Sequence, residues 1–362
     1  MEIQQRNYGI EFLRIIAMFM IVILHTLGQG GILGSVTSSS SQFHAAWILE
    51  ITCFCAVNIY ALISGFVLSE KPFQLSRLIN LWISIVFYTI TITFIASAMG
   101  WNSISLNGIL NALFPISRQQ YWYLSSYCGL LLLTPFLNKA LAMIEKHEVK
   151  TVLIPGIFFV SIMPTLFSSD PLSTHVGYST IWLSILYLVG GWIKKSDIKY
   201  RFKPGWLIAT FGIMVLVTHF SKIILIYVTK NWFAIDNECN VLITYISPTI
   251  IISSIALFLF FINVKFTALQ MKIIGLLSPM ALGVYIIHAN PLIWNHFVKD
   301  FAVSYVQYDS IAFIILVVAS AMAIYLVCSL IDYIRIKFFQ LAQAKRFGEF
   351  LDGKFSSLID RF

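Results

Sequence analysis

Charged side chains are scarce in this sequence of 362 residues, where Asp, Glu, Lys and Arg together make up 11%. In a water-soluble domain, these four residue types make up about a quarter of the chain. Hydrophobic residues instead make up 59% of the chain, and the mean hydropathy is +0.84. This much apolar surface exceeds what a folded core can bury, so part of it must face lipid. The lack of charge therefore excludes soluble enzymes and disordered chains, and it predicts a polytopic membrane protein.

Cysteine is also scarce, and its distribution excludes two further classes of protein. Four of the five cysteines lie within apolar runs, where a thiol behaves as a small hydrophobic group. No pair has the spacing of a zinc site, so we expect neither a disulfide framework nor a metal site.

Basic patches of the kind that bind nucleic acid are absent from the polar segments. The first apolar stretch contains Glu11 and Arg14 and lacks a small-residue cleavage site, which predicts a retained span.

Apolar windows of about 20 residues recur along the chain between charged or Gly/Ser/Pro-rich breaks. They predict an all-α integral membrane protein, a bundle of about ten transmembrane helices. The windows lie near residues 10–29, 46–69, 78–99, 121–142, 151–168, 178–193, 206–228, 241–263, 273–294 and 310–332.

The basic residues predict the orientation of these spans. Of the 24 Lys and Arg residues, 19 fall on one side of the predicted membrane, three on the other, and two within spans. Because cytoplasmic loops carry the excess of positive charge, both termini are predicted to be cytoplasmic. We expect a ten-span domain over 1–335 and a cytoplasmic tail over 336–362, in which 347–362 has the apolar spacing of an amphipathic helix lying on the membrane surface.

Three ionisable residues in the first span are candidates for function, because burying such groups in a membrane is costly. Arg14 and His25 are 11 positions apart, which puts them on one face of a helix and separates them by about 16 Å. Glu11 lies one turn before Arg14 and can pair with it. The alternative is structural: Glu11 and Arg14 would extend to the interface, and His25 would hydrogen-bond another helix.

A second intramembrane histidine, His288, is predicted to lie at the same depth as His25. It stands 15 positions into the ninth span, as His25 stands 15 positions into the first. The two imidazoles could line one cavity, although a packing role for His288 fits the sequence equally well.

The segment IEFLRIIAMFMIVILHT, residues 10–26, resembles the opening helix of the type 3 membrane acyltransferases, a bacterial family that O-acylates surface glycans. The signature of that family is an acidic residue, an arginine, ten residues and a histidine, here Glu11, Arg14 and His25. Further similar segments are LISGFVLS at 62–69, Arg77, YWYLSSYCGLLLLTPFL at 121–137 and LGVYIIHANPL at 282–292.

The resemblance implies an acyl-coenzyme A donor from the cytoplasm and a sugar hydroxyl as acceptor, with acetyl as the usual group and no bound cofactor. On this basis His25 is the predicted general base or a transient acyl carrier, and Arg14, supported by Glu11, positions the donor. The remaining candidates are Arg77 and Ser64 on the donor side and, on the acceptor or oxyanion side, His288, Tyr285, Asn58, Trp122, Tyr123 and Ser125.

We therefore predict a bacterial inner-membrane O-acyltransferase, most simply an O-acetyltransferase, acting on a surface polysaccharide or its lipid-linked precursor. Its expected partners are acyl-coenzyme A, the glycan acceptor and membrane lipid, with a second copy of the chain as an open possibility. The main alternative is a transporter or flippase of lipid-linked sugars, in which buried charges line a pathway. A glycan polymerase is a third possibility, but only three basic residues lie on the predicted outer side.

Overall fold

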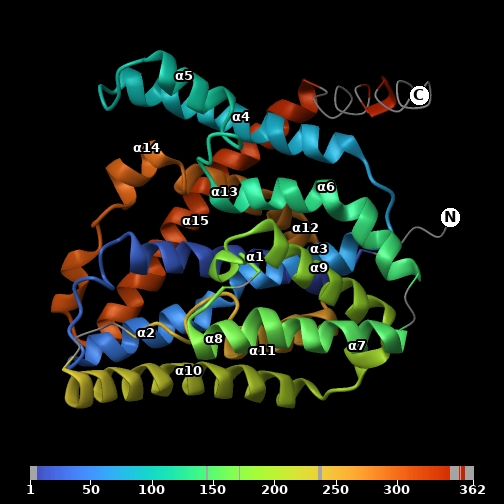
Figure 1. The fold of residues 1–362 in the computed structure, drawn as a ribbon. Helices are drawn as coiled ribbons and strands as arrows, with labels where there is room; N and C mark the ends of the chain where they lie inside the picture. Colours follow the sequence, from blue (N-terminus) through green and yellow to red (C-terminus); the bar gives the residue numbers. More distant parts are fainter. Residues whose placement is uncertain are drawn as a thin grey trace.

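The structure, a computed structural model, describes residues 6–143, 146–170, 172–234, 239–342, 350 and 352–354. Every regular element in these residues is a helix, and they contain no strand (Figure 1). Six helical segments are long and apolar enough to cross a membrane: Tyr8–Gly28, Ser41–Leu68, Leu75–Ala98, Pro204–Phe233, Ala268–His288 and Ser310–Leu341. The predicted all-α membrane bundle is confirmed to this extent. The number of ten spans and the cytoplasmic placement of the termini stay predictions.

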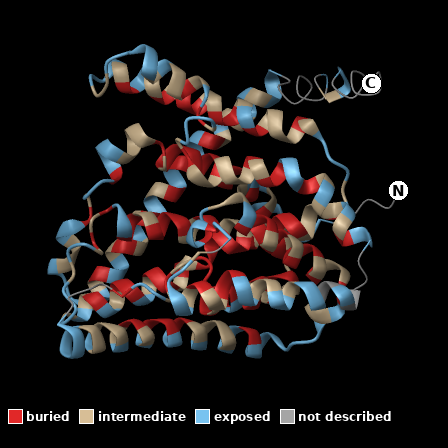
Figure 2. Ribbon diagram, viewed as in Figure 1, coloured by how far each residue is buried: buried red, intermediate tan, exposed pale blue. Residues whose placement is uncertain are grey.

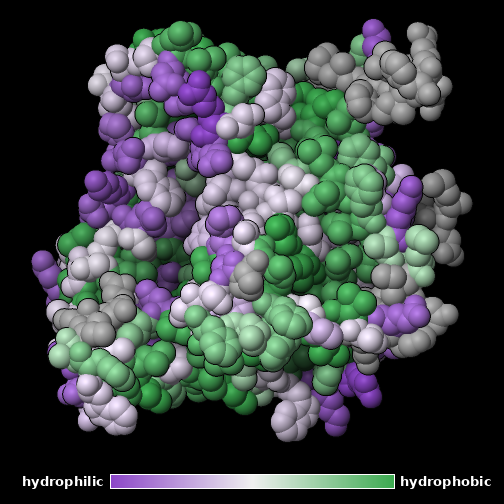
Figure 3. All heavy atoms as spheres, in the orientation of Figure 1, coloured by the Kyte–Doolittle hydropathy of each residue, from purple (hydrophilic) through white to green (hydrophobic). Residues whose placement is uncertain are grey.

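The core of the bundle includes α1 (Tyr8–Gly28), α3 (Ala56–Leu68) and α9 (Thr180–Lys195), together with α11 (Pro248–Ile262) and α13 (Ala281–His288). Buried residues concentrate on these central helices, whereas the outer helices expose much of their surface (Figure 2). On the face in Figure 3, hydrophobic residues cover much of the middle and hydrophilic residues gather toward the left and right edges. This distribution fits helices that run across a membrane, because lipid contacts the outer helices and water contacts the ends.

The crossing of α3 and α9 depends on two glycines. A Cβ on Gly65 would lie 1.9 Å from the carbonyl oxygen of Tyr187, and one on Gly190 would lie 2.2 Å from that of Leu62. No side chain larger than hydrogen fits at either position. Small residues let two membrane helices approach closely, and here they fix α3, which carries residues of the site, against its neighbour.

Several predicted spans are interrupted in the structure. The window at 46–69 is divided at Cys55 into α2 (Ser41–Phe54) and α3. The window at 151–168 includes a π-helical turn at Phe158–Ile162, which follows Pro155. A proline cannot donate a backbone hydrogen bond and disturbs the helix around it. Hydropathy marks apolar length and does not register these changes of backbone geometry.

Two helix boundaries differ from prediction in a way that shapes the site. The window at 241–263 yields α11 only from Pro248 to Ile262, so residues 241–247 form an irregular segment. The window at 273–294 yields α12 (Ala268–Leu277) and α13 (Ala281–His288), and the helix ends at His288, shortly before Pro291. Irregular backbone at membrane depth is tolerated where it is covered by protein or lines a cavity.

The remaining helices are α4 and α6 (Leu75–Ala98 and Trp122–Met143), α5 (Leu106–Leu113), α7 (Lys146–Ile157), α8 (Met163–Phe167), α10 (Pro204–Phe233), α14 (Pro291–Ile293) and α15 (Ser310–Leu341). As a single helix, α15 continues past residue 335, where we predicted the domain to end. Most of the predicted amphipathic helix at 347–362 lies outside the described residues.

The described part of the tail includes Asp352, which contacts the start of α4. Its carboxylate accepts hydrogen bonds from the backbone N–H of Leu75 at 3.1 Å and from the hydroxyl of Ser76 at 3.0 Å. The first N–H groups of a helix have no partner within it, so a carboxylate there stabilises the helix terminus. The tail is thereby joined to the end of α4 that leads to Arg77.

Candidate active site

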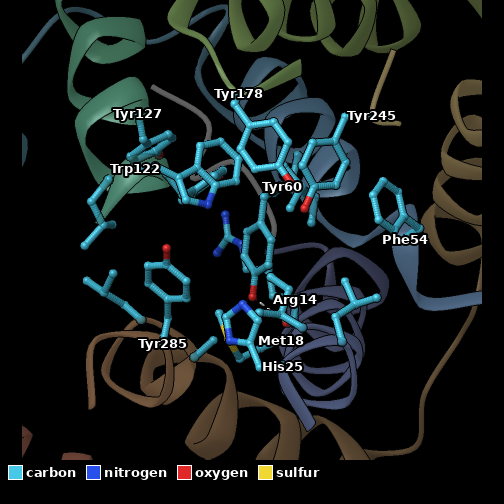
Figure 4. Close-up of a pocket in the computed structure, with 18 of the residues that line it drawn as sticks. Arg14, Met18, His25, Phe54, Tyr60, Trp122, Tyr127, Tyr178, Tyr245 and Tyr285 are labelled. Atoms are coloured by element: carbon cyan, nitrogen blue, oxygen red, sulfur yellow. Dashed lines mark hydrogen bonds between the residues drawn. The ribbon is translucent and has the colours of Figure 1, made fainter. Parts of the chain in front are cut away.

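A cavity of about 620 Å³ lies inside the bundle, and both Arg14 and His25 line it (Figure 4). The two residues are separated by about 16 Å of helix rise along α1. We call the two parts of the cavity the Arg14 end and the His25 end. Exposed Gly28 and Gln29 also line the His25 end, so the cavity reaches the surface there. The single face predicted from the sequence is thus the face that α1 presents to one cavity.

At the Arg14 end, the first turns of α1 form a polar cluster. Arg14 Nη1 lies 3.2 Å from Glu11 Oε1, which is the pair expected from the sequence. The other carboxylate oxygen of Glu11 pairs with Arg6 at 3.2 Å and accepts a hydrogen bond from the Ser278 hydroxyl. These contacts satisfy the Glu11 carboxylate and fix one edge of the Arg14 guanidinium. Arg14 keeps 30% of its side chain exposed, so its remaining N–H groups can reach a ligand.

Further cations surround this end of the cavity. The pKa of Lys71, in the connection between α3 and α4, is lowered by burial and then by the positive charges of Arg77, Lys194 and Arg14. Arg77 does not line the cavity itself, but Leu81, one turn later on α4, does. Lys194 forms an ion pair with Glu70 at 2.7 Å. Several positive charges therefore act together at the Arg14 end, which suits an anionic ligand.

At the His25 end, the two intramembrane histidines are in direct contact. His25 Nδ1 lies 2.8 Å from His288 Nε2, although 263 positions separate the residues in the sequence. His288 Nδ1 in turn bonds the backbone carbonyl of Val284, one turn earlier on α13. His288 is 1% exposed and does not line the cavity, whereas His25 does.

This chain of hydrogen bonds fixes the tautomers of both neutral rings. A carbonyl oxygen can only accept, so His288 Nδ1 carries the proton and His288 Nε2 accepts. His25 Nδ1 must then donate to His288, which leaves His25 Nε2 without a proton. Nε2 of His25 can therefore act as a base, and the hydrogen bond to His288 holds the His25 ring in place. If His25 takes up a second proton, His288 still accepts from it.

The other predicted residues divide into two groups. Ser64, Trp122, Tyr123 and Tyr285 line the cavity with Arg14 and His25. Asn58 and Ser125 do not line it, and both bond neighbouring protein groups. The Asn58 amide donates to the Tyr245 carbonyl at 2.8 Å and accepts from the Trp182 indole at 3.0 Å. The Ser125 hydroxyl donates to backbone carbonyls. These contacts indicate that Asn58 and Ser125 support the cavity wall, and the roles predicted for all the site residues stay predictions.

Several residues of the cavity wall were not among those predicted from the sequence. The most informative omission is Glu50, because an acidic residue within the window at 46–69 meets the same criterion that selected Glu11 and Arg14. Further omissions are aromatic residues of the lining. Aromatic residues are frequent in this chain, and nothing in the sequence distinguished these from the rest: Phe54, Tyr60, Tyr127, Tyr178, Tyr245 and Trp294.

Comparison with known families decides the class of this site. A family model described as an acyltransferase domain matches residues 7–333, nearly the whole chain. The chain belongs to the acyltransferase 3 family. This confirms the resemblance stated from residues 10–26, and together with the long apolar helices it identifies a multi-pass membrane acyltransferase. In the two other comparisons, no curated protein and no solved structure matched the chain.

Proposed function

We propose that this acyltransferase transfers an acyl group, acetyl in the simplest case, from acyl-coenzyme A to a hydroxyl of a bacterial surface polysaccharide or its lipid-linked precursor. The protein would act in the inner membrane, taking the donor from the cytoplasmic side. The observation that carries the proposal is the single cavity that joins the cationic Arg14 end to a histidine pair at the His25 end.

The Arg14 end suits the donor because coenzyme A carries several phosphate groups. Guanidinium groups bind phosphate through paired, charge-assisted hydrogen bonds, and Arg14 has N–H groups to spare. Arg77 and Lys71 add positive charge beside it. With its phosphates held there, the thin pantetheine arm of the donor would extend along α1. The rise of about 16 Å between Arg14 and His25 is of the right order for that arm.

The His25 end suits the transfer step. Nε2 of His25 would take the proton of the acceptor hydroxyl while its oxygen attacks the thioester carbonyl. Tyr285, whose ring centroid is 6.5 Å from that of His25, is our candidate for stabilising the resulting oxyanion. When the C–S bond breaks, the proton passes from His25 to the leaving thiolate. Throughout, Nε2 of His288 accepts a hydrogen bond from the Nδ1–H of His25 and so holds the ring in the active tautomer.

A flippase of lipid-linked sugars would also need buried polar groups. It would not need a histidine whose partner leaves one ring nitrogen basic, and family membership favours group transfer. The two functions differ in one measurable respect, since a flippase moves its substrate without consuming thioester.

The test is acetyl-coenzyme A turnover by the purified protein in detergent, followed as thiol release and as transfer of labelled acetyl groups. We expect His25→Ala to abolish turnover and Arg14→Ala to raise the KM for acetyl-coenzyme A about tenfold or more, because a charge-assisted contact contributes about 1.5–3 kcal/mol. Matched controls are His296→Ala and Arg118→Ala, both exposed residues outside the cavity. Full activity of His25→Ala would show that the base is misassigned. A wild-type protein that consumes no thioester would contradict the proposed function.

A further inference from the structure

Glu50 lies one turn before the end of α2, on the wall of the cavity, and the transfer step above does not use it. Its side chain is buried, at 7% exposure, and within the described part of the chain its Oε2 has no hydrogen-bond partner. An unpartnered carboxyl group at membrane depth is costly. A polar ligand that completed its hydrogen bonds would offset this cost, and here the group lines a cavity large enough to admit one.

Aromatic rings from four separate parts of the chain surround this part of the cavity. Phe54 is one turn after Glu50 on α2, and its ring stacks on that of Tyr245 with centroids 4.7 Å apart. Tyr178 lies 4.9 Å from Tyr245 and 4.4 Å from Trp122, measured between centroids. We call Phe54, Trp122, Tyr178 and Tyr245 the aromatic wall. Figure 4 shows it along one side of the cavity, opposite His25.

The aromatic wall is held in place by its surroundings. Asn58 donates a hydrogen bond to the backbone carbonyl of Tyr245 at 2.8 Å and is itself fixed by Trp182. Gly177 adopts a positive φ of +103°, and a Cβ there would lie 2.3 Å from the Cβ of Tyr245. The glycine therefore allows the segment that carries Tyr178 to pack against Tyr245. These contacts form a preorganised surface, which reduces the entropy lost when a ligand binds.

The wall also brings polar groups to the part of the cavity that Glu50 lines. Glu50, Tyr178 and Tyr245 all line this cavity, and the ring of Phe54, one turn after Glu50, stacks on that of Tyr245. One carboxyl and two phenol hydroxyls offer acceptors and donors beside aromatic faces. Pockets for small ligands combine such apolar walls with a few polar groups that fix orientation.

We propose that Glu50 and the aromatic wall form the acceptor subsite and bind one pyranose ring. The carboxyl of Glu50 accepts hydrogen bonds from two ring hydroxyls that are not acylated, and the C–H face of the sugar packs on Trp122 and Tyr178. The hydroxyl to be acylated then faces His25 on the opposite side of the cavity. This inference rests on the proposed function, because it names how the same site holds its acceptor.

A ligand with a quaternary ammonium group is the competing chemistry, since aromatic rings and a carboxylate also attract cations. The phenol hydroxyls of Tyr178 and Tyr245, which line the same cavity as Glu50, favour a polyhydroxylated ring, because a quaternary ammonium group has no hydrogen-bond donor or acceptor for them. The experiment therefore includes both kinds of probe.

The first measurement is binding, and it requires no turnover. Thermal unfolding of the purified protein is followed with increasing concentrations of methyl glucoside, galactoside, rhamnoside and N-acetylglucosaminide, and separately with tetramethylammonium. We expect at least one pyranoside to raise the Tm of the wild type in a saturable way, and Glu50→Leu to remove that shift. Asp300→Asn, an exposed carboxylate on the described surface, is the control that should keep it. Stabilisation by none of the sugars, or by tetramethylammonium alone, would overturn the proposal.

The second measurement separates the acceptor from the donor. With the pyranoside that binds, Glu50→Leu should raise the KM for the acceptor about tenfold or more, the loss expected when two hydrogen bonds to a buried carboxyl group are removed. Its KM for acetyl-coenzyme A should stay within about twofold of the wild type, because the donor phosphates would bind at the Arg14 end. Glu50→Gln keeps the size of the side chain and some of its hydrogen bonds. Its KM for the acceptor should therefore lie between those of the wild type and Glu50→Leu. An unchanged acceptor KM, or a change in the donor KM alone, would contradict the assignment of Glu50. If sugars bind but no thioester is consumed, the proposed function fails and the subsite stands.

Discussion

The hydrogen bond between the two histidines makes a prediction about a residue that does not touch the substrate. In the structure, His288 lies behind His25, and its Nε2 accepts a hydrogen bond from the Nδ1–H of His25 with 2.8 Å between the two nitrogens. His288 is almost completely buried. His288→Leu removes that acceptor with a side chain of similar volume and leaves the His25 N–H unsatisfied. It also removes the constraint that selects the basic Nε2 tautomer. His288 is thus a positioning residue, and its loss should lower the rate without affecting the binding of the donor.

The size of the effect follows from the contact. A buried donor left without its partner costs about 1–3 kcal/mol. Because His25 becomes positively charged during transfer, the bond is stronger in the transition state, and the cost falls on kcat. Since about 1.4 kcal/mol corresponds to a factor of ten in rate, we expect kcat to fall by about 5- to 150-fold. The KM for acetyl-coenzyme A should stay within about twofold, because the donor phosphates would bind at the Arg14 end.

Substitution by glutamine distinguishes the hydrogen bond from packing. The amide oxygen of a glutamine at position 288 can accept the His25 proton, so His288→Gln should recover much of the rate that His288→Leu loses. The assay is steady-state thiol release over a range of acetyl-coenzyme A concentrations, with melting temperatures to check folding and His296→Ala as control. Equal impairment of the Leu and Gln variants, or a kcat for His288→Leu within twofold of wild type, would refute the reasoning.

Two further predictions concern the fold and the donor end. Gly65→Leu should prevent α3 from packing on α9, because a Cβ there would lie 1.9 Å from the Tyr187 carbonyl oxygen; the check is the yield and melting temperature of the purified variant, and a wild-type melting temperature would contradict the proposed packing. Burial and the neighbouring charge of Arg77 lower the pKa of Lys71, so its positive charge is lost at a lower pH than that of an ordinary lysine. If that charge helps to bind phosphate, the KM for acetyl-coenzyme A should rise on the alkaline side of neutrality, and Lys71→Arg should shift the rise to higher pH. A KM whose pH profile is the same in both proteins would exclude Lys71 from donor binding.

The spacing of residues along the first helix predicted much of the candidate site, because a helix has a fixed geometry. The 11 positions between Arg14 and His25 determine a shared face and a rise of about 16 Å wherever the helix lies. Apolar windows of about 20 residues likewise predict helices in lipid, since no other open-chain structure satisfies its backbone there. The Glu11–Arg14 pair follows from the same geometry, as neighbours one turn apart can reach each other.

The aromatic wall could not be predicted in this way. Tyr178 and Tyr245 lie in irregular segments, at positions that depend on where α9 and α11 begin. Hydropathy placed residues 241–247 within a span, yet the helix starts only at Pro248. Glu50 is a different case: its place in an apolar window was visible in the sequence, and its role became arguable only when the aromatic rings around it were known.

The sequence by itself determined that the chain is a helical membrane protein of an acyltransferase family and that Arg14 and His25 face the same way. These properties depend on composition and on residues close together in the chain. Only the tertiary structure decided that His288 is the partner of His25, and that Glu50 faces a wall of aromatic rings. His25 and His288 lie on helices that are distant in sequence, and the aromatic wall comes from helix ends and irregular segments that are also far apart. Helix packing, which no local pattern specifies, brings these parts together.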